Sequence, residues 1–130
     1  MSATYSYNTT EKLKSRKLLD QLFTKGRSVS AFPVKAFYMP LLSDAEVIVQ
    51  AGVGVSARNF TKAVHRNRIK RLLRETYRLN KAILQEGLQA DQKKAAVFFL
   101  YIGKEIPDFV TLNELMPSLL NKLAIAIAKA

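Results

Sequence analysis

Residues 56–81 read SARNFTKAVHRNRIKRLLRETYRLNK, and this stretch holds the densest positive charge of the chain. Between Arg58 and Lys81, nine lysine and arginine side chains accompany a single acidic residue, Glu75, so the segment accounts for +8 of the formal net charge of +11. Such a cluster repels itself unless a polyanion offsets it, and contact with phosphates releases condensed counterions. The charge pattern therefore favours nucleic-acid contact over a nuclear-localisation-like cluster or a merely solvated surface.

The same stretch has the spacing of an amphipathic helix, which we expect from about residue 61 to residue 85, with Gly87 at its end. At about 100° per residue, one stripe is mainly apolar and should anchor the helix, while the charges stay in water. The stripe consists of Ile69, Leu72, Leu73, Thr76 and Tyr77. His65 is interpreted as a hydrogen-bonding surface residue, with RNA contact as the second alternative. Guanidinium forks suit phosphates or guanine edges, and the sequence leaves open which of the two they meet. The candidate RNA-binding residues are Arg58, Lys62, Arg66, Asn67, Arg68, Lys70, Arg71 and Arg74.

Outward from this helix, the patterns predict a single α+β domain over residues 12–130, after a flexible polar arm at residues 1–11. A short helix should run from an N-cap at Ser15 to Gly26. Residues 32–41, whether one strand or two, and residues 46–56 are rich in β-branched and aromatic side chains and should form strands.

The C-terminal part is predicted to contribute one strand and one helix. Residues 95–102 are apolar on both alternating faces, which is typical of a central strand covered on both sides. A core-facing helix should follow, with Thr111 and Glu114 as a possible capping box. Pro117 lies too deep for an undisturbed helix of that kind, so the helix either starts near Met116 or kinks.

One strand face could bind single-stranded RNA. Alternation places Lys35 and Phe37 on the same face, and Phe23 from the first helix should lie nearby. Aromatic side chains beside a cation can stack bases and attract phosphates. A core role for Phe23 and Phe37 is about equally consistent with the sequence.

Several functions are disfavoured by composition. Cysteine is absent and there is one histidine, so thiolate catalysis, disulfides and cysteine-ligated or histidine-caged metals are not expected. Acidic residues are scattered, so no catalytic and no metal-binding residue is assigned. Residues 52–57 match G-x-G-x-x-A but lack the acidic residue and larger sheet of a dinucleotide site, and their small side chains are interpreted as allowing close packing against the basic helix or a ligand. No membrane span or secretory signal is evident, so we expect a cytoplasmic protein.

The sequence Gly52-Val53-Gly54-Val55-Ser56-Ala57-Arg58, followed by Lys62-Ala63-Val64-His65-Arg66-Asn67-Arg68-Ile69-Lys70-Arg71-Leu72-Leu73-Arg74-Glu75, resembles the signature of the bacterial ribonuclease P protein subunits. The resemblance implies a two-layer α/β sandwich around a mixed four-stranded sheet, in the order α-β-β-β-α-β-α. It also implies a left-handed β-α-β crossover, similar to a ribosomal-protein domain. Handedness of that kind departs from the general rule for such crossovers.

The resemblance further implies that the protein binds a catalytic RNA and precursor tRNA, and with them removes 5′ leaders by hydrolysis. In such a complex the RNA supplies the catalytic site, and Mg²⁺ is held mainly by RNA and substrate, with none intrinsic to the protein. No membrane and no obligatory protein partner is implied. Two alternatives remain, a structural ribosomal or general RNA-binding protein and a stand-alone nuclease. By resemblance, Arg66, Asn67, Arg68, Lys70, Arg71 and Arg74 belong to the RNA-binding helix, and Phe23, Lys35 and Phe37 to a leader-binding cleft.

Overall fold

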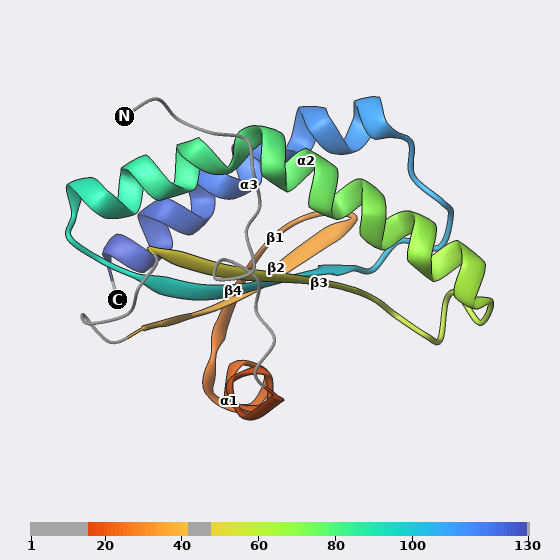
Figure 1. Ribbon diagram of the computed structural model, residues 1–130, viewed down its shortest axis with the longest axis horizontal. Helices are drawn as coiled ribbons and strands as arrows, with labels where there is room; N and C mark the ends of the chain where they lie inside the picture. Colours follow the sequence, from red (N-terminus) through yellow and green to blue (C-terminus); the bar gives the residue numbers. More distant parts are fainter. Residues whose placement is uncertain (1–15, 42–47, 130) are drawn as a thin grey trace.

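The computed structural model describes residues 16–41 and 48–129. The predicted arm at residues 1–11 and the predicted N-cap Ser15 lie outside the described residues. The elements follow the predicted order (Figure 1). They are α1 (Arg16–Lys25), β1 (Arg27–Ala31), β2 (Val34–Pro40), β3 (Val49–Val55), α2 (Ala63–Ala90), β4 (Ala95–Tyr101) and α3 (Phe109–Ala128).

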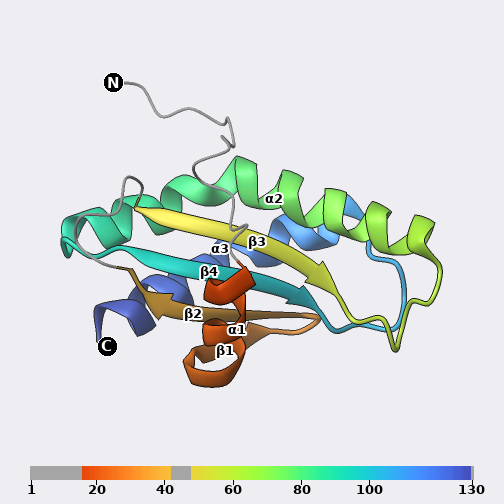
Figure 2. The same ribbon diagram turned by 60° about the horizontal axis from the view of Figure 1, so that its bottom comes forward.

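The four strands form one mixed sheet in the order β1-β2-β4-β3. β2 pairs antiparallel with β1 and with β4, whereas β3 and β4 are parallel. In Figure 2, β3 and β4 point the same way and α2 passes behind the sheet between them, which makes this crossover left-handed. The predicted architecture is confirmed, including this exception to the handedness rule.

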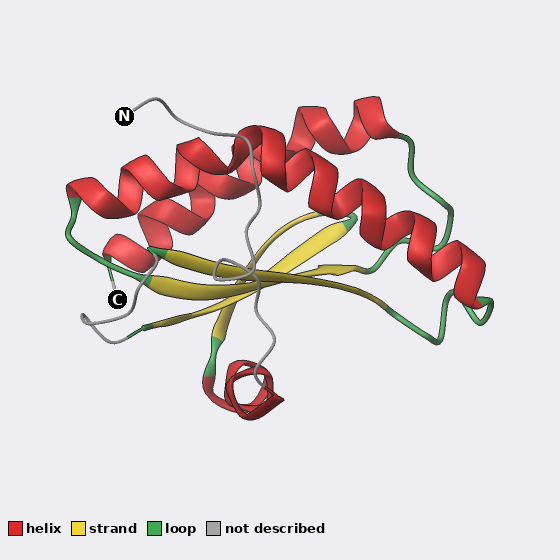
Figure 3. Cartoon of the chain, viewed as in Figure 1, coloured by secondary structure: helices red, strands yellow, loops and turns green. Residues whose placement is uncertain are grey.

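Helices cover the two faces of the sheet unequally (Figures 1 and 3). α2 and α3 pack side by side over one face, and α1 lies alone against the other, where it contacts β2 and β4. The main core lies between the sheet and the pair of long helices. Its largest fully buried side chains include Ile69, Leu73, Tyr77, Phe99, Leu112 and Met116.

The strand boundaries differ from the sequence prediction at the first hairpin. β1 begins at Arg27, upstream of the expected start at residue 32, and β2 begins at Val34. Residues 32 and 33 form the turn between them. The expected segment thus contains a single strand, β2, which answers the question of one strand or two. The preceding strand, β1, was not predicted because its sequence, RSVSA, is polar.

α2 is longer than predicted, because Gly87 does not end it. The helix continues to Ala90, and a Cβ atom added to Gly87 would lie 3.1 Å from Cβ of Ala124 in α3. Glycine at this position therefore lets the two helices approach closely, which outweighs its low helix propensity.

The start of α3 also differs from the prediction. Asp108 is the N-cap, and its carboxylate accepts a hydrogen bond from the backbone N–H of Thr111 at 2.7 Å. Thr111 therefore does not act as the N-cap of a capping box with Glu114, and of the two alternatives for Pro117 the start near Met116 is wrong. The helix begins at Phe109 and contains Pro117 within its length.

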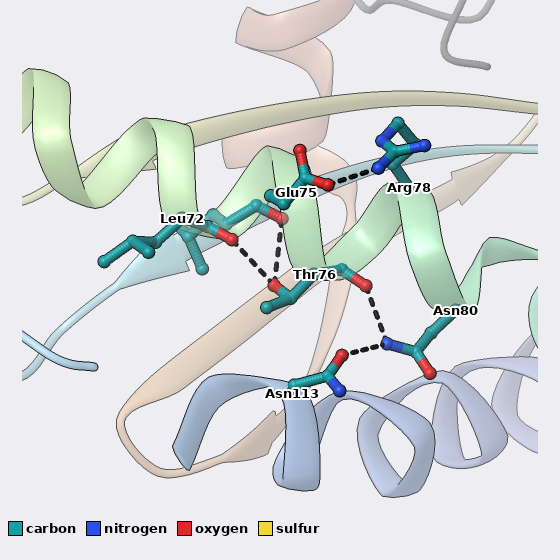
Figure 4. A network of polar contacts seen from close by, with 7 residues as sticks. Leu72, Glu75, Thr76, Arg78, Asn80 and Asn113 are labelled. Carbon is teal, nitrogen blue, oxygen red and sulfur yellow. Dashed lines mark hydrogen bonds and ion pairs between the residues drawn. The ribbon is translucent and has the colours of Figure 1, made fainter. Parts of the chain in front are cut away.

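A polar network joins α2 to α3 (Figure 4). The hydroxyl of Thr76 donates to the carbonyl oxygens of Leu72 and Leu73, at 2.9 and 3.1 Å. Nδ2 of Asn80 lies 2.8 Å from the carbonyl oxygen of Thr76 and 2.8 Å from Oδ1 of Asn113, to both of which it donates. These bonds satisfy polar groups that helix packing removes from water.

Candidate nucleic-acid interface

The first half of α2 and the loop before it present a cationic surface, which we call the cationic face. The stripe of α2 that was predicted to anchor the helix is confirmed. Ile69, Leu73, Thr76 and Tyr77 are buried, and Leu72 is half-buried. Lys70 and Arg66 are half-buried at its border. The exposed members of the cationic face are Arg58, Lys62, Asn67, Arg68, Arg71 and Arg74.

An open hollow of about 800 Å³ lies on the cationic face. It is lined by Val64, His65, Asn67, Arg68 and Arg71. Cationic and amide groups around a wide, open depression suit a bulky polyanion better than an enclosed small molecule.

The cationic face ends at Arg74, whereas the charge cluster in the sequence extends to Lys81. Glu75 forms an ion pair with Arg78 one turn further on, and the hydrogen bond to Glu75 raises the pKa of Arg78 (Figure 4). Lys81 is only 4% exposed. The expectation that all charges of the helix stay in water is therefore wrong for Lys81, which turns toward the protein interior.

Arg66 and Asn59 bind the backbone of neighbouring segments. Nη1 of Arg66 donates to the carbonyl oxygens of Phe60 and Thr61, at 3.0 and 2.8 Å. Nδ2 of Asn59 donates to the carbonyl oxygens of residues 102 and 103. Sequence reasoning missed Asn59 altogether, since nothing in its local pattern points to a contact 43 residues away.

The opposite face of the sheet carries an aromatic surface. The Phe23 ring is 48% exposed and contacts the rings of Phe37 and Phe98 edge-on, with both centroid distances 5.2 Å. Nζ of Lys35 lies 5.0 Å from the centroid of the Phe37 ring, within the range of a cation–π contact. We call Phe23, Lys35, Phe37 and Phe98 the aromatic shelf.

Phe98 is the member that the sequence did not reveal. The run at residues 95–102 was expected to be covered on both faces, but Phe98 and Leu100 remain partly exposed. α1 covers this face only locally, where Leu22 packs near Ala96. Phe37 pairs with Phe98 across β2 and β4, and the Phe23 ring contacts both rings. Phe37 and Phe98 belong to a small cluster that is separate from the main core.

Two features are absent from the described residues, a cluster of metal ligands and a membrane-crossing helix. Among residues 16–41 and 48–129, no group of three or more histidine or acidic side chains is placed to hold a metal ion. Within the same ranges, no helix combines the length and the apolar character needed to cross a bilayer.

Together these features define a class of α+β protein with a cationic helix over one sheet face and an aromatic shelf on the other. Comparison with known proteins identifies a family. The family model for ribonuclease P matches residues 7–124. The ribonuclease P protein component of Porphyromonas gingivalis is 34% identical over 122 residues, covering 94% of this chain and 89% of the relative. That of Chlorobium phaeobacteroides is 32% identical, covering 89% and 86%.

Solved structures share the fold. The RNase P protein of Staphylococcus aureus superimposes with a TM-score of 0.68 at 18% identity, covering 90% of this chain and 97% of that one. The protein from Thermotoga maritima gives 0.67 at 24% identity, covering 86% and 96%. The chain belongs to the ribonuclease P protein family, whose members are components of a ribonucleoprotein nuclease of tRNA processing.

Proposed function

We propose that this protein binds the catalytic RNA of ribonuclease P through the cationic face and grips the 5′ leader of precursor tRNA on the aromatic shelf. The observation that carries the proposal is the location of two chemically different surfaces, the cationic face and the aromatic shelf, on opposite sides of one sheet. Phosphate-rich structured RNA matches exposed cations on a rigid helix. A single-stranded leader matches partly exposed rings beside a lysine, because unstacked bases can pack on aromatic faces.

In this proposal the protein contributes binding and positioning, while the RNA provides the catalytic site. Arg68, Arg71 and Arg74 screen phosphate repulsion, and Phe23, Phe37 and Phe98 offer ring surfaces to the leader. Mg²⁺ is assigned to the RNA and substrate. Cleavage of precursor tRNA would take place in the cytoplasm.

Two other functions are less well supported. A stand-alone nuclease would need a carboxylate or histidine cluster for metal-assisted hydrolysis, and the described residues contain no such cluster of three. A general RNA-binding module would explain the cationic face but gives no role to the lysine and rings of the aromatic shelf.

The decisive experiment is reconstitution with a purified RNase P RNA, for example that of Porphyromonas gingivalis, and precursor tRNA at low Mg²⁺. We expect this protein to stimulate leader removal and to cleave nothing by itself. It should also bind leader-bearing precursor more tightly than leaderless tRNA when the RNA is present. Absence of stimulation would contradict the proposal, and equal affinity for the two tRNAs would favour a general RNA-binding module.

A further inference from the structure

The loop from residue 56 to residue 62, between β3 and α2, is held by bonds along its length. The N–H of Ser56 donates to the carbonyl oxygen of Tyr101 at 3.3 Å, and that of Phe60 to the carbonyl oxygen of Ser56 at 3.2 Å. The Phe60 ring is buried, with its centroid 6.0 Å from that of Tyr101. The loop is therefore anchored both to the end of β4 and to the core.

Two polar side chains complete this anchoring. Asn59 bonds the carbonyl oxygens of Ile102 and Gly103, at 3.3 and 3.2 Å. Arg66 reaches back from the first turns of α2 to the carbonyl oxygens of Phe60 and Thr61. Both hydrogen bonds of Arg66 come from the same nitrogen, Nη1, so that group is already engaged without any ligand.

The loop displays two exposed cations, Arg58 and Lys62. Arg58 precedes Asn59, and Lys62 is the N-cap residue of α2, with no side-chain hydrogen bond to the helix. If the loop were free, RNA binding would have to pay for ordering it, and preorganisation removes that cost. Bonds that order the loop also fix where the backbone places Arg58 and Lys62.

We infer that Arg66 and Asn59 are positioning residues, which hold the loop so that Arg58 and Lys62 are preorganised to meet RNA phosphates. The inference rests on the proposed function and refines it, because it gives Arg66 a role in shaping the interface, whereas Arg68, Arg71 and Arg74 make the contacts. Exposure agrees with this division, since Arg66 is half-buried and the other three arginines are exposed.

Amide hydrogen exchange of the free protein tests the anchoring without any RNA. In Arg66→Met and in Asn59→Ala, exchange at the amide of Phe60 should accelerate about tenfold, the effect of losing one or two hydrogen bonds. Exchange at the core amides of α2 should stay unchanged. The midpoint temperature of thermal unfolding should change by no more than a few degrees. Asn121→Ala, an exposed asparagine in α3, is the matched control. Unchanged loop exchange in both variants would overturn the inference.

Affinity for the same RNase P RNA tests the consequence through a mutant cycle. Arg66→Met and Asn59→Ala should each weaken binding about three- to tenfold in the natural background. In a chain that also has Arg58→Ala and Lys62→Ala, the same changes should cost less than about twofold, because residues that act through one another are not additive. Full additivity would make Arg66 a direct contact and overturn the inference. Failure of the unaltered protein to bind RNA would instead contradict the proposed function, leaving the exchange result intact.

Discussion

The Phe98 ring lies against Gly54 of the adjacent strand, so closely that a Cβ atom added to Gly54 would lie 2.5 Å from Cζ of the ring. The small residues before the basic helix were interpreted as allowing close packing against that helix or a ligand. For Gly54 the interpretation is wrong about the helix, because the space is filled by an aromatic side chain of β4. Glycine here lets Phe98 lean across β3 within the aromatic shelf.

Replacing Gly54 by alanine should therefore displace the Phe98 ring. We expect Gly54→Ala to lower the free energy of unfolding by about 1–3 kcal/mol, the usual range for overpacking. In a Phe98→Leu background the same change should cost much less, because the ring atoms that clash are gone. Urea unfolding of the four proteins in this cycle measures the difference, and equal costs in both backgrounds would show that the ring is not responsible.

Phe37 should contribute to leader binding by stacking. Phe37→Leu keeps an apolar side chain but removes the ring. The affinity of the protein, measured in the presence of the RNase P RNA, for leader-bearing precursor should therefore fall about tenfold. Affinity for leaderless tRNA should be unchanged. Phe32→Leu is the control, since Phe32 is 77% exposed in the β1–β2 turn and does not belong to the aromatic shelf. A similar loss for both tRNAs would argue against leader contact.

Arg68 should contact a phosphate of the catalytic RNA. The slope of log affinity against log salt should then decrease by about 0.7–0.9 in Arg68→Ala, the contribution of one phosphate. Lys129→Ala removes an exposed cation near the end of α3 and should leave the slope as it is. Filter-binding titrations at several salt concentrations measure both, and an unaltered slope in Arg68→Ala would exclude it from the interface.

The hydrogen bond between Asn80 and Asn113 should stabilise the packing of α2 on α3. Asn113→Ala is expected to lower the free energy of unfolding by about 1 kcal/mol. Asn80→Ala should cost more, because Asn80 also donates to the carbonyl oxygen of Thr76. Thermal unfolding of the single and double variants gives the coupling energy between Asn80 and Asn113. Strictly additive losses would show that the bond between them does not contribute to stability.

Asp108 links stability to pH in the acid range. Its hydrogen bond from the Thr111 N–H lowers the pKa of the carboxyl below its ordinary value of 3.8. The folded state thus binds the proton more weakly than the unfolded state, so the stabilisation is complete above pH 3.8 and is lost as pH falls through the lowered pKa. Asp108→Asn should remove this acid dependence while keeping an N-cap side chain. Identical pH profiles for the two proteins between pH 5 and pH 2 would contradict this assignment.

Local patterns were enough for the order of elements and for the cationic helix. Apolar spacing identified the stripe that anchors α2, and the excess of lysine and arginine identified its exposed side. The end of α2 and the start of α3 were predicted less accurately, because the effects of Gly87 and Pro117 on a helix depend on the residues around them. Close packing against Ala124 keeps Gly87 inside the helix, and the cap at Asp108 starts α3 early enough to include Pro117.

Helical periodicity and net charge are properties of neighbouring residues, so the chain itself specified a basic amphipathic helix and a strand–helix alternation. Contacts between distant segments depend on strand register and helix placement, which no local pattern contains. Folding alone decided that Phe98 joins Phe23 and Phe37, that Lys81 is buried, and that Arg66 and Asn59 hold the loop before α2. For the aromatic contacts and the hydrogen bonds, the partner lies on another segment or on a turn whose path only the packed core defines.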